Sequence, residues 1–182
     1  MEKLFITAQE LLEDSFRLAV CIHESGFEPE LIIGIWRGGT PIGIAVHEYF
    51  EYKGIHTDHI AIRAKSYTGI NSRTEDVEIT GLDYIYDHTG KDDKLLIIDD
   101  VFDSGNSFKT IIEKLEGNYG NAIVKRTKIA CPWFKPGNNK TNIIPDYYLN
   151  ETDKWLVFPH ELADLTEAEI DKGKSVISSI VK

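Results

Sequence analysis

The stretch that decides the fold lies in the second half of the chain and reads Leu95-Leu96-Ile97-Ile98-Asp99-Asp100-Val101-Phe102-Asp103-Ser104-Gly105-Asn106-Ser107. It begins with four apolar residues, the pattern of a short strand that is buried on both faces. Two acids and a run of small polar residues follow, and apolar residues then recur at helical spacing from Phe108 to Leu115. The order of strand, tight loop and helix predicts one βα unit of an α/β fold.

The loop of this unit has the chemistry to hold a ribose phosphate. The backbone N–H groups of residues 104–107 would lie at a helix N-terminus, where unpaired donors and the helix dipole favour a phosphate. Gly105 would let the anion approach closely. Asp99 and Asp100 suit the hydroxyls of a ribose, directly or through Mg²⁺. The alternative is that these residues only cap a helix after a buried strand, an arrangement common in α/β proteins.

Further strands and helices are predicted on both sides of this unit. Thr7 and Glu10 form a capping box that begins a helix, and Gly26 ends it. A buried strand over residues 31–35 leads through Trp36-Arg37-Gly38-Gly39 to a second helix, with Thr40 as N-cap and Pro41 as its first residue. More strands are expected at residues 59–62, 122–130, 147–149 and 155–158, and weak helical signals at residues 166–171.

The alternation of helices and apolar strands predicts an α/β protein with a mainly parallel sheet flanked by helices on both faces. Such sheets bind ligands at the carboxyl ends of their strands. The candidate sites therefore follow Ile35, Ile62 and Ile98.

Composition narrows the classes of function. The chain has 182 residues and 42% hydrophobic content, which suits one compact domain. No apolar run is long enough to cross a bilayer, and the N-terminus is too polar for a signal peptide, so we expect a soluble cytoplasmic protein. The formal charge of −10 opposes binding to nucleic acid or to an anionic membrane. Cys21 and Cys131 lack metal-binding spacing, and both are expected to be buried thiols.

Residues 95–107 resemble the 5-phosphoribosyl-1-pyrophosphate (PRPP) signature of the type I phosphoribosyltransferases. The resemblance implies that the chain is one such domain over residues 1–182, with a small hood lobe for the base. It implies that PRPP is bound through Mg²⁺ and by seven residues of the signature, namely Asp99, Asp100, Asp103, Ser104, Gly105, Asn106 and Ser107. A Walker A loop is absent, so nucleoside triphosphate hydrolysis is not supported.

Two further segments resemble the same family. The Arg37-Gly38-Gly39 run is similar to the pyrophosphate loop of bacterial xanthine-guanine enzymes, where Arg37 and Gly38 would bind pyrophosphate. Lys65, Ser66 and Tyr67 resemble part of the mobile loop of hypoxanthine-guanine enzymes, which implies a loop over residues 64–80 that closes on the reacting centre. An ordinary glycine-rich turn and a solvated loop are the respective alternatives.

The last segment, residues 133–165, resembles the purine-binding lobe of the 6-oxopurine enzymes. Lys135 would donate to O6 of the base, Trp155 would stack on its ring, and the Leu156 backbone would face its 2-position. Glu161 would join Asp99 and Asp100 as a metal ligand. For Trp155 a core aromatic, and for Lys135 a surface lysine, are the alternatives.

The resemblance implies a purine-salvage transferase that converts hypoxanthine, guanine or xanthine with PRPP to the nucleoside monophosphate and pyrophosphate. Asp103 would be the catalytic base that accepts the N7 proton. A homodimer or homotetramer is implied, with small molecules rather than nucleic acid or membrane as partners. Two other hypotheses stay open, a regulator that only senses PRPP and an enzyme that uses orotate, uracil or adenine.

Overall fold

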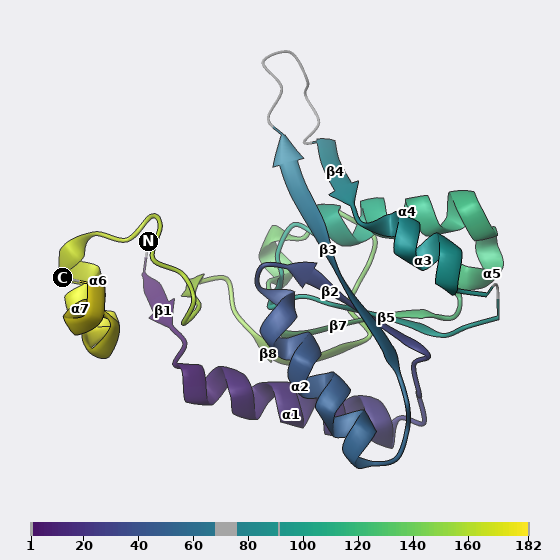
Figure 1. Cartoon of the computed structure of the whole chain (residues 1–182). Coiled ribbons are helices and arrows are strands. Elements are labelled where there is room, and N and C mark those ends of the chain that lie inside the picture. The colour runs from purple at the N-terminus through teal and green to yellow at the C-terminus, as the bar shows by residue number, and fades with distance from the viewer. Residues whose placement is uncertain (1, 68–75, 91, 182) are drawn as a thin grey trace. The chain divides into compact units, whose positions relative to one another are not determined.

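The structure is a computed structural model that describes residues 2–67, 76–90 and 92–181 (Figure 1). Its contacts divide the chain into two compact units, a larger one of Leu12–Asp153 and a smaller one that joins Met1–Leu11 to Lys154–Lys182. The predicted lobe over residues 133–165 is therefore shared between the two units. No helix in the described ranges is long and apolar enough to span a membrane.

The larger unit is built on one mixed sheet whose strand order is β4-β3-β2-β5-β7-β6, with β8 also paired to β7. Every pair in it is parallel except β3 with β4. The elements in chain order are α1 (Ala8–Glu24), β2 (Leu31–Trp36), α2 (Gly39–Tyr52), β3 (Asp58–Tyr67), β4 (Asp76–Thr80), α3 (Leu82–His88), β5 (Leu95–Ile98), β6 (Val101–Phe102), α4 (Asn106–Tyr119), α5 (Asn121–Val124), β7 (Thr127–Phe134), a 3-10 turn (Pro136–Asn138) and β8 (Tyr147–Glu151). The expected mainly parallel sheet flanked by helices is confirmed.

Helices cover both faces of the sheet, with α2 on one side and α3 and α4 on the other (Figure 1). The central strands β2 and β5 are therefore buried on both faces, as their continuous apolar pattern predicts. One core cluster combines alternate residues of β2 and β5 with the apolar face of α4, for example Ile33, Ile97 and Ile111. On the other face the buried residues of α2 include Ile42, Val46 and Phe50.

Helix starts follow the sequence signals closely, with one shift. At α1 the Thr7 hydroxyl accepts from the Glu10 N–H at 3.1 Å, and the Glu10 carboxylate accepts from the Thr7 N–H at 2.8 Å. The capping box is thus confirmed. Helix α2 begins at Gly39 with Gly38 as N-cap, so the prediction of Thr40 as N-cap was wrong. Thr40 instead donates its hydroxyl to the Arg37 carbonyl at 2.8 Å, inside the first turn.

In the described residues 64–67 and 76–80, the expected loop over residues 64–80 forms a pair of strands. β3 continues to Tyr67, and β4 pairs with it antiparallel in a register that places Lys65 opposite Glu78. Polar and charged side chains suit this hairpin because it forms an edge of the sheet, whose two faces need not both be buried. Residues 68–75, the centre of the predicted mobile loop, lie outside the described residues.

Two other local predictions need correction. Residues 121–124 form helix α5, so the strand expected from residue 122 begins only at Thr127. Gly120, at a φ of 77°, separates α4 from α5 and lets the chain turn before β7. Cys21 is exposed on α1, whereas Cys131 is buried in β7 as expected.

The smaller unit pairs strand β1 (Lys3–Phe5) in parallel with β9 (Trp155–Val157) and adds helices α6 (Glu167–Gly173) and α7 (Ser175–Val181). The predicted strand near residue 155 and the helix signal near residue 166 are confirmed. Phe5 packs closely under Gly173, where a β-carbon would lie 2.3 Å from the Phe5 ring. The buried Lys174 donates its ammonium group to the carbonyls of Phe158 and Pro159.

Candidate active site

The carboxyl ends of β2 and β5 bring two glycines against the acidic pair. Gly34 of β2 pairs with Ile98 of β5, so the segments that follow these strands start side by side. A β-carbon at Gly39 would lie 2.2 Å from the Ile98 carbonyl oxygen, and one at Gly38 would lie 1.8 Å from a carboxylate oxygen of Asp100. Only glycine allows this approach, which joins the Arg37-Gly38-Gly39 loop to the signature loop.

Asp99 and Asp100 form a close pair of carboxyl groups at the end of β5. Asp100 is buried, and its N–H donates to the Asp99 carboxylate at 2.9 Å. Burial and the charge of Asp100 raise the pKa of Asp99 well above its ordinary value, although hydrogen bonds from the backbones of Asp100 and Gly39 act in the opposite direction. A bound cation would offset the negative charge of these two carboxyl groups.

The loop after the acidic pair leads into α4 through Gly105. Gly105 precedes α4 as its N-cap and adopts a φ of 78°, a conformation that disfavours any residue with a β-carbon. A β-carbon there would also lie 2.7 Å from the Thr141 hydroxyl. The Asn106 N–H donates to the Ser104 hydroxyl oxygen at 3.4 Å, inside this loop. The first N–H groups of a helix have no carbonyl partner within the helix itself, which suits the start of α4 to an anion.

Asp103 lies at this loop and is held by two donors from one later segment. Its Oδ2 accepts from Lys135 Nζ at 3.0 Å, and its Oδ1 accepts from Asn138 Nδ2 at 2.9 Å. The Lys135 side chain is only 8% exposed, whereas that of Asp103 is 45% exposed. The alternative of a surface lysine is therefore wrong, because Lys135 is buried beside the signature loop.

Backbone pairing explains why residues so distant in sequence meet here. β6 pairs with the end of β7, so that Phe102 lies opposite Phe134. The chain then continues with a hydrogen bond from the Lys135 N–H to the Phe102 carbonyl at 2.9 Å. A second one runs from the Lys140 N–H to the Ser104 carbonyl at 3.0 Å. The signature loop and the segment of Lys135 are thus joined along their backbones.

The sequence model of the phosphoribosyl transferase domain matches residues 6–165. This chain belongs to the phosphoribosyl transferase domain family. The family inferred from the signature residues 95–107 is thereby confirmed.

Several members of this phosphoribosyl transferase family are similar to the chain. A hypoxanthine-guanine phosphoribosyltransferase of Lactococcus lactis is 28% identical over 148 residues, 81% of this chain and 75% of that protein. The crystal structure of a purine phosphoribosyltransferase of Pyrococcus horikoshii has a TM-score of 0.70 at 29% identity, covering 91% of this chain and 98% of that one. The xanthine-guanine-hypoxanthine phosphoribosyltransferase of Helicobacter pylori shares the fold, with a TM-score of 0.70 at 17% identity over both full chains.

The acidic pair fits a magnesium ion in a phosphoribosyl transferase domain. Magnesium in such sites is held through one or two carboxylates and completed by phosphate oxygens and water. Asp99 and Asp100 supply carboxylates whose mutual repulsion a divalent cation would relieve. Within residues 2–67, 76–90 and 92–181, no three His, Cys, Asp or Glu side chains gather as a metal cluster.

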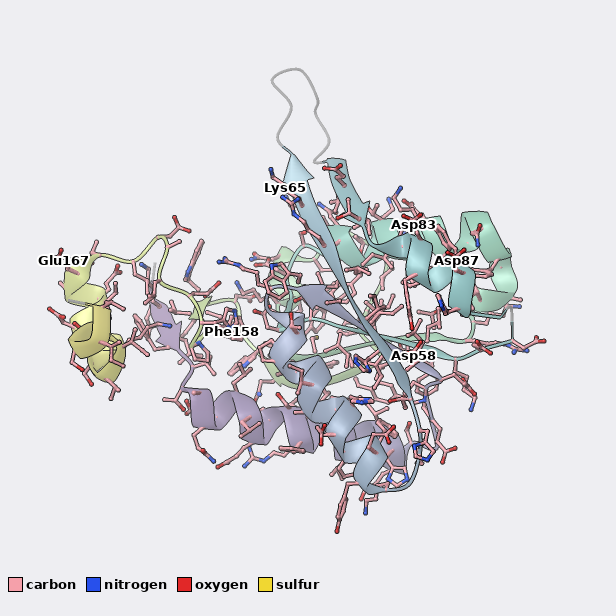
Figure 2. The ribbon with its side chains drawn as sticks, in the orientation of Figure 1. Asp58, Lys65, Asp83, Asp87, Phe158 and Glu167 are labelled. Carbon is pink, nitrogen blue, oxygen red and sulfur yellow. The ribbon has the colours of Figure 1, made fainter. Side chains whose placement is uncertain are left out.

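The remaining predicted site residues of the larger unit lie at the ends of β2 and β3. Arg37 is exposed at the end of β2, after a cis peptide bond from Trp36. Lys65 lies on the part of β3 that leads into the hairpin (Figure 2), and Ser66 and Tyr67 follow it in the same strand. Roles in pyrophosphate binding and in loop closure stay predictions for these residues.

Three of the predicted residues belong to the smaller unit. Trp155 is 48% exposed on β9, which argues against the alternative of a core aromatic, whereas Leu156 beside it is buried. The Glu161 carboxylate accepts a hydrogen bond from the N–H of Phe158, labelled in Figure 2, at 2.9 Å and so closes a turn after β9. Base stacking by Trp155, base contact by Leu156 and metal binding by Glu161 stay predictions.

Sequence reasoning missed Asn138 and Thr141. Both lie in a run of glycine, asparagine and lysine that reads as an ordinary turn, and they reach the signature loop only because β6 pairs with β7. The position of Asn138, three residues after Lys135, is the one signal that could have indicated it.

Proposed function

We propose that this protein transfers the phosphoribosyl group of PRPP to a 6-oxopurine base and releases pyrophosphate. The observation that carries the proposal is the pairing of the buried Lys135 with Asp103 at the edge of the signature loop. A cationic donor and a carboxylate acceptor then lie together. They match O6 and the N7 proton of a 6-oxopurine, which lie on one edge of the ring.

The selectivity follows from the same pair. Lys135 has only donors, so it suits a carbonyl oxygen at position 6 and opposes the amino group of adenine. A buried donor that is left without its acceptor costs free energy, which makes such a site reject the wrong base. The Lactococcus lactis and Pyrococcus horikoshii relatives, a hypoxanthine-guanine and a purine phosphoribosyltransferase, support this choice of substrate.

In the reaction, N9 of the base would attack C1 of the ribose while the bond from C1 to pyrophosphate breaks. Asp103 would accept the N7 proton, so that the attacking ring stays uncharged, a contribution of about 10²- to 10⁴-fold for general base catalysis. Asp99 and Asp100 would position the ribose, and the amides of residues 104–107 its phosphate. Bound Mg²⁺ would supply charge neutralisation at the pyrophosphate. Arg37 and the Gly38 amide would hold the leaving group.

The decisive experiment offers six bases separately to the purified protein with Mg²⁺ and PRPP, namely hypoxanthine, guanine, xanthine, adenine, orotate and uracil. We expect nucleotide formation with one or more of the three 6-oxopurines only. The Asp103→Asn variant should be slower by at least about tenfold, and Asp87→Asn, which changes an exposed aspartate of α3 (Figure 2), should match the unmodified protein.

Other outcomes point to the two other hypotheses. Conversion of orotate, uracil or adenine would contradict the assigned role of Lys135 and indicate another acceptor. Binding of PRPP without conversion of any base would indicate a sensor of PRPP rather than an enzyme.

A further inference from the structure

The Asp103 carboxylate is held at both oxygens by residues of one short segment. Lys135 binds Oδ2 and Asn138 binds Oδ1, at 3.0 and 2.9 Å. The two donors differ in kind, because Lys135 is a buried cation and Asn138 is an exposed neutral amide. Two donors at opposite oxygens fix the plane of a carboxylate, which one donor alone would leave free to rotate.

Asn138 is itself held in place by the backbone of its turn. It ends the 3-10 turn Pro136–Asn138, in which its N–H donates to the Lys135 carbonyl at 3.2 Å. The preceding Gly137 N–H donates to the Asp153 carboxylate at 3.0 Å, and a β-carbon at Gly137 would lie 2.7 Å from that carboxylate. The amide of Asn138 therefore reaches Asp103 from an ordered turn, which lowers the entropic cost of that hydrogen bond.

We infer that Asn138 is the positioning residue of Asp103, a role that rests on the proposed transfer to a 6-oxopurine. When the base binds, Lys135 turns from Oδ2 to O6 of the ring, and Oδ2 becomes the acceptor for the N7 proton. Asn138 keeps Oδ1 throughout and holds the carboxylate plane toward the base. A neutral amide suits this task because it orients the carboxylate without competing with Lys135 for the carbonyl of the base.

The proton and electrons balance in this scheme. The N9 lone pair forms the bond to C1 of the ribose, and the electron pair of the broken C1–O bond leaves on pyrophosphate. The electron pair of the N7–H bond stays in the purine ring, and the proton moves to Oδ2 of Asp103. Release of this proton to solvent after the nucleotide departs restores the carboxylate and its contact with Lys135.

The test combines Asn138→Ala with Asp103→Asn in a double-mutant cycle on the full chain. With the 6-oxopurine that the unmodified protein converts, we expect Asn138→Ala to lower kcat by roughly tenfold, because the Asp103 carboxylate loses its fixed orientation. The KM for PRPP should stay within about twofold of that of the unmodified protein, since the substitution affects Asp103 rather than the amides of residues 104–107. In the Asp103→Asn background, Asn138→Ala should cause no further loss.

Two variants separate positioning from a general effect on the turn. Asn138→Gln keeps an amide donor and should recover part of the kcat that Asn138→Ala loses. Asn142→Ala makes the same change at an exposed asparagine of the same segment and should leave kcat unchanged.

An unchanged kcat in Asn138→Ala, or losses that add in the double variant, would overturn the role of Asn138 while leaving the transferase proposal intact. A parallel rise in the KM for PRPP would also overturn it, since that result would show damage to the whole loop. Absence of turnover in the unmodified protein with every base would instead overturn the proposed function and, with it, this role.

Discussion

At the scale of single residues, the site depends on how closely backbones can approach. At Gly38 and Gly39, where α2 begins beside the end of β5, the Asp100 carboxylate and the Ile98 carbonyl occupy the space that a β-carbon would need. The sequence pattern identifies these glycines as part of a loop, but their neighbours are an acid and a carbonyl some 60 residues away in sequence. A glycine in such a place is required by its surroundings rather than by its own φ.

The contrast between Gly39 and Gly117 tests this requirement. A β-carbon at Gly39 would meet the Ile98 carbonyl oxygen at 2.2 Å, and because that atom is backbone, either β5 or α2 must move. We expect Gly39→Ala to lower the free energy of unfolding by about 3 kcal/mol or more. Gly117 lies on the exposed side of α4 with nothing within 4 Å of its β-carbon position. Gly117→Ala should raise the stability by about 0.5 to 1 kcal/mol.

Urea unfolding of both variants gives the two free energies. Equal effects of the two substitutions would show that the approach of Gly39 to Ile98 does not matter for stability.

At the scale of secondary-structure elements, the smaller unit depends on the start of α6. Thr166 and Glu169 form a capping box, in which the Glu169 carboxylate accepts from the Thr166 N–H at 2.9 Å. The other oxygen of Glu169 forms a salt bridge with Lys3 of β1 at 2.7 Å. Figure 2 labels Glu167, the first residue of α6, which marks this end of the helix. One carboxylate therefore links the cap of α6 to β1.

These contacts make the stability of α6 depend on pH. The Lys3 ammonium, and then the hydrogen bonds from Thr166, lower the pKa of Glu169 from its ordinary value of 4.5 to about 2. Because the pKa is lower in the folded chain, the stabilisation is complete above pH 4.5 and is lost as the pH falls toward 2. Unmodified protein should therefore be more stable than Glu169→Gln at pH 6, and the difference should shrink steadily below pH 4.5.

Amide hydrogen exchange of the α6 residues at several pH values measures this difference. Glu167→Gln, an exposed change in the same helix, provides the control and should give a smaller and flatter difference. A constant gap between unmodified protein and Glu169→Gln down to pH 2 would contradict the salt bridge and cap as its cause.

At the scale of the whole molecule, the sheet order assembles the site from distant segments. β2 and β5 are neighbours, and β5 and β6 lie along β7, so the loops after β2, β5 and β7 meet at one edge. This arrangement follows from parallel pairing, which places all carboxyl ends on the same side of a sheet. Localisation in the cytoplasm and assembly as a dimer or tetramer stay predictions.

The folded molecule should also distinguish its two thiols. Cys131 is buried in the sheet, and burial raises the pKa of its thiol, whereas Cys21 is exposed on α1. Since the thiolate is the reactive form, a disulfide reagent should modify one thiol per folded chain and both thiols in denaturant. Cys21→Ser should abolish the native reaction, and Cys131→Ser should leave it. Reaction of both thiols in the folded protein would contradict the burial of β7.

Local patterns in the sequence were enough to predict the alternation of elements, the capping box of α1 and the glycine-containing loop that leads into α4. Each of these features depends on residues within a few positions of each other, such as Thr7 with Glu10 or Gly105 with the start of α4. Composition could not show the β3–β4 hairpin, because an edge strand tolerates the polar residues that usually indicate a loop.

What only the tertiary structure decided is which residues meet. Gly38 packs on Asp100, and Lys135 and Asn138 donate hydrogen bonds to Asp103. These contacts join segments that no local sequence pattern relates. They arise because strand pairing sets the register of β5, β6 and β7, and register is a property of the whole sheet. The acids and glycines of the site and Lys135 could thus be predicted from the sequence, whereas their geometry and the contacts of Asn138 and Thr141 required the fold.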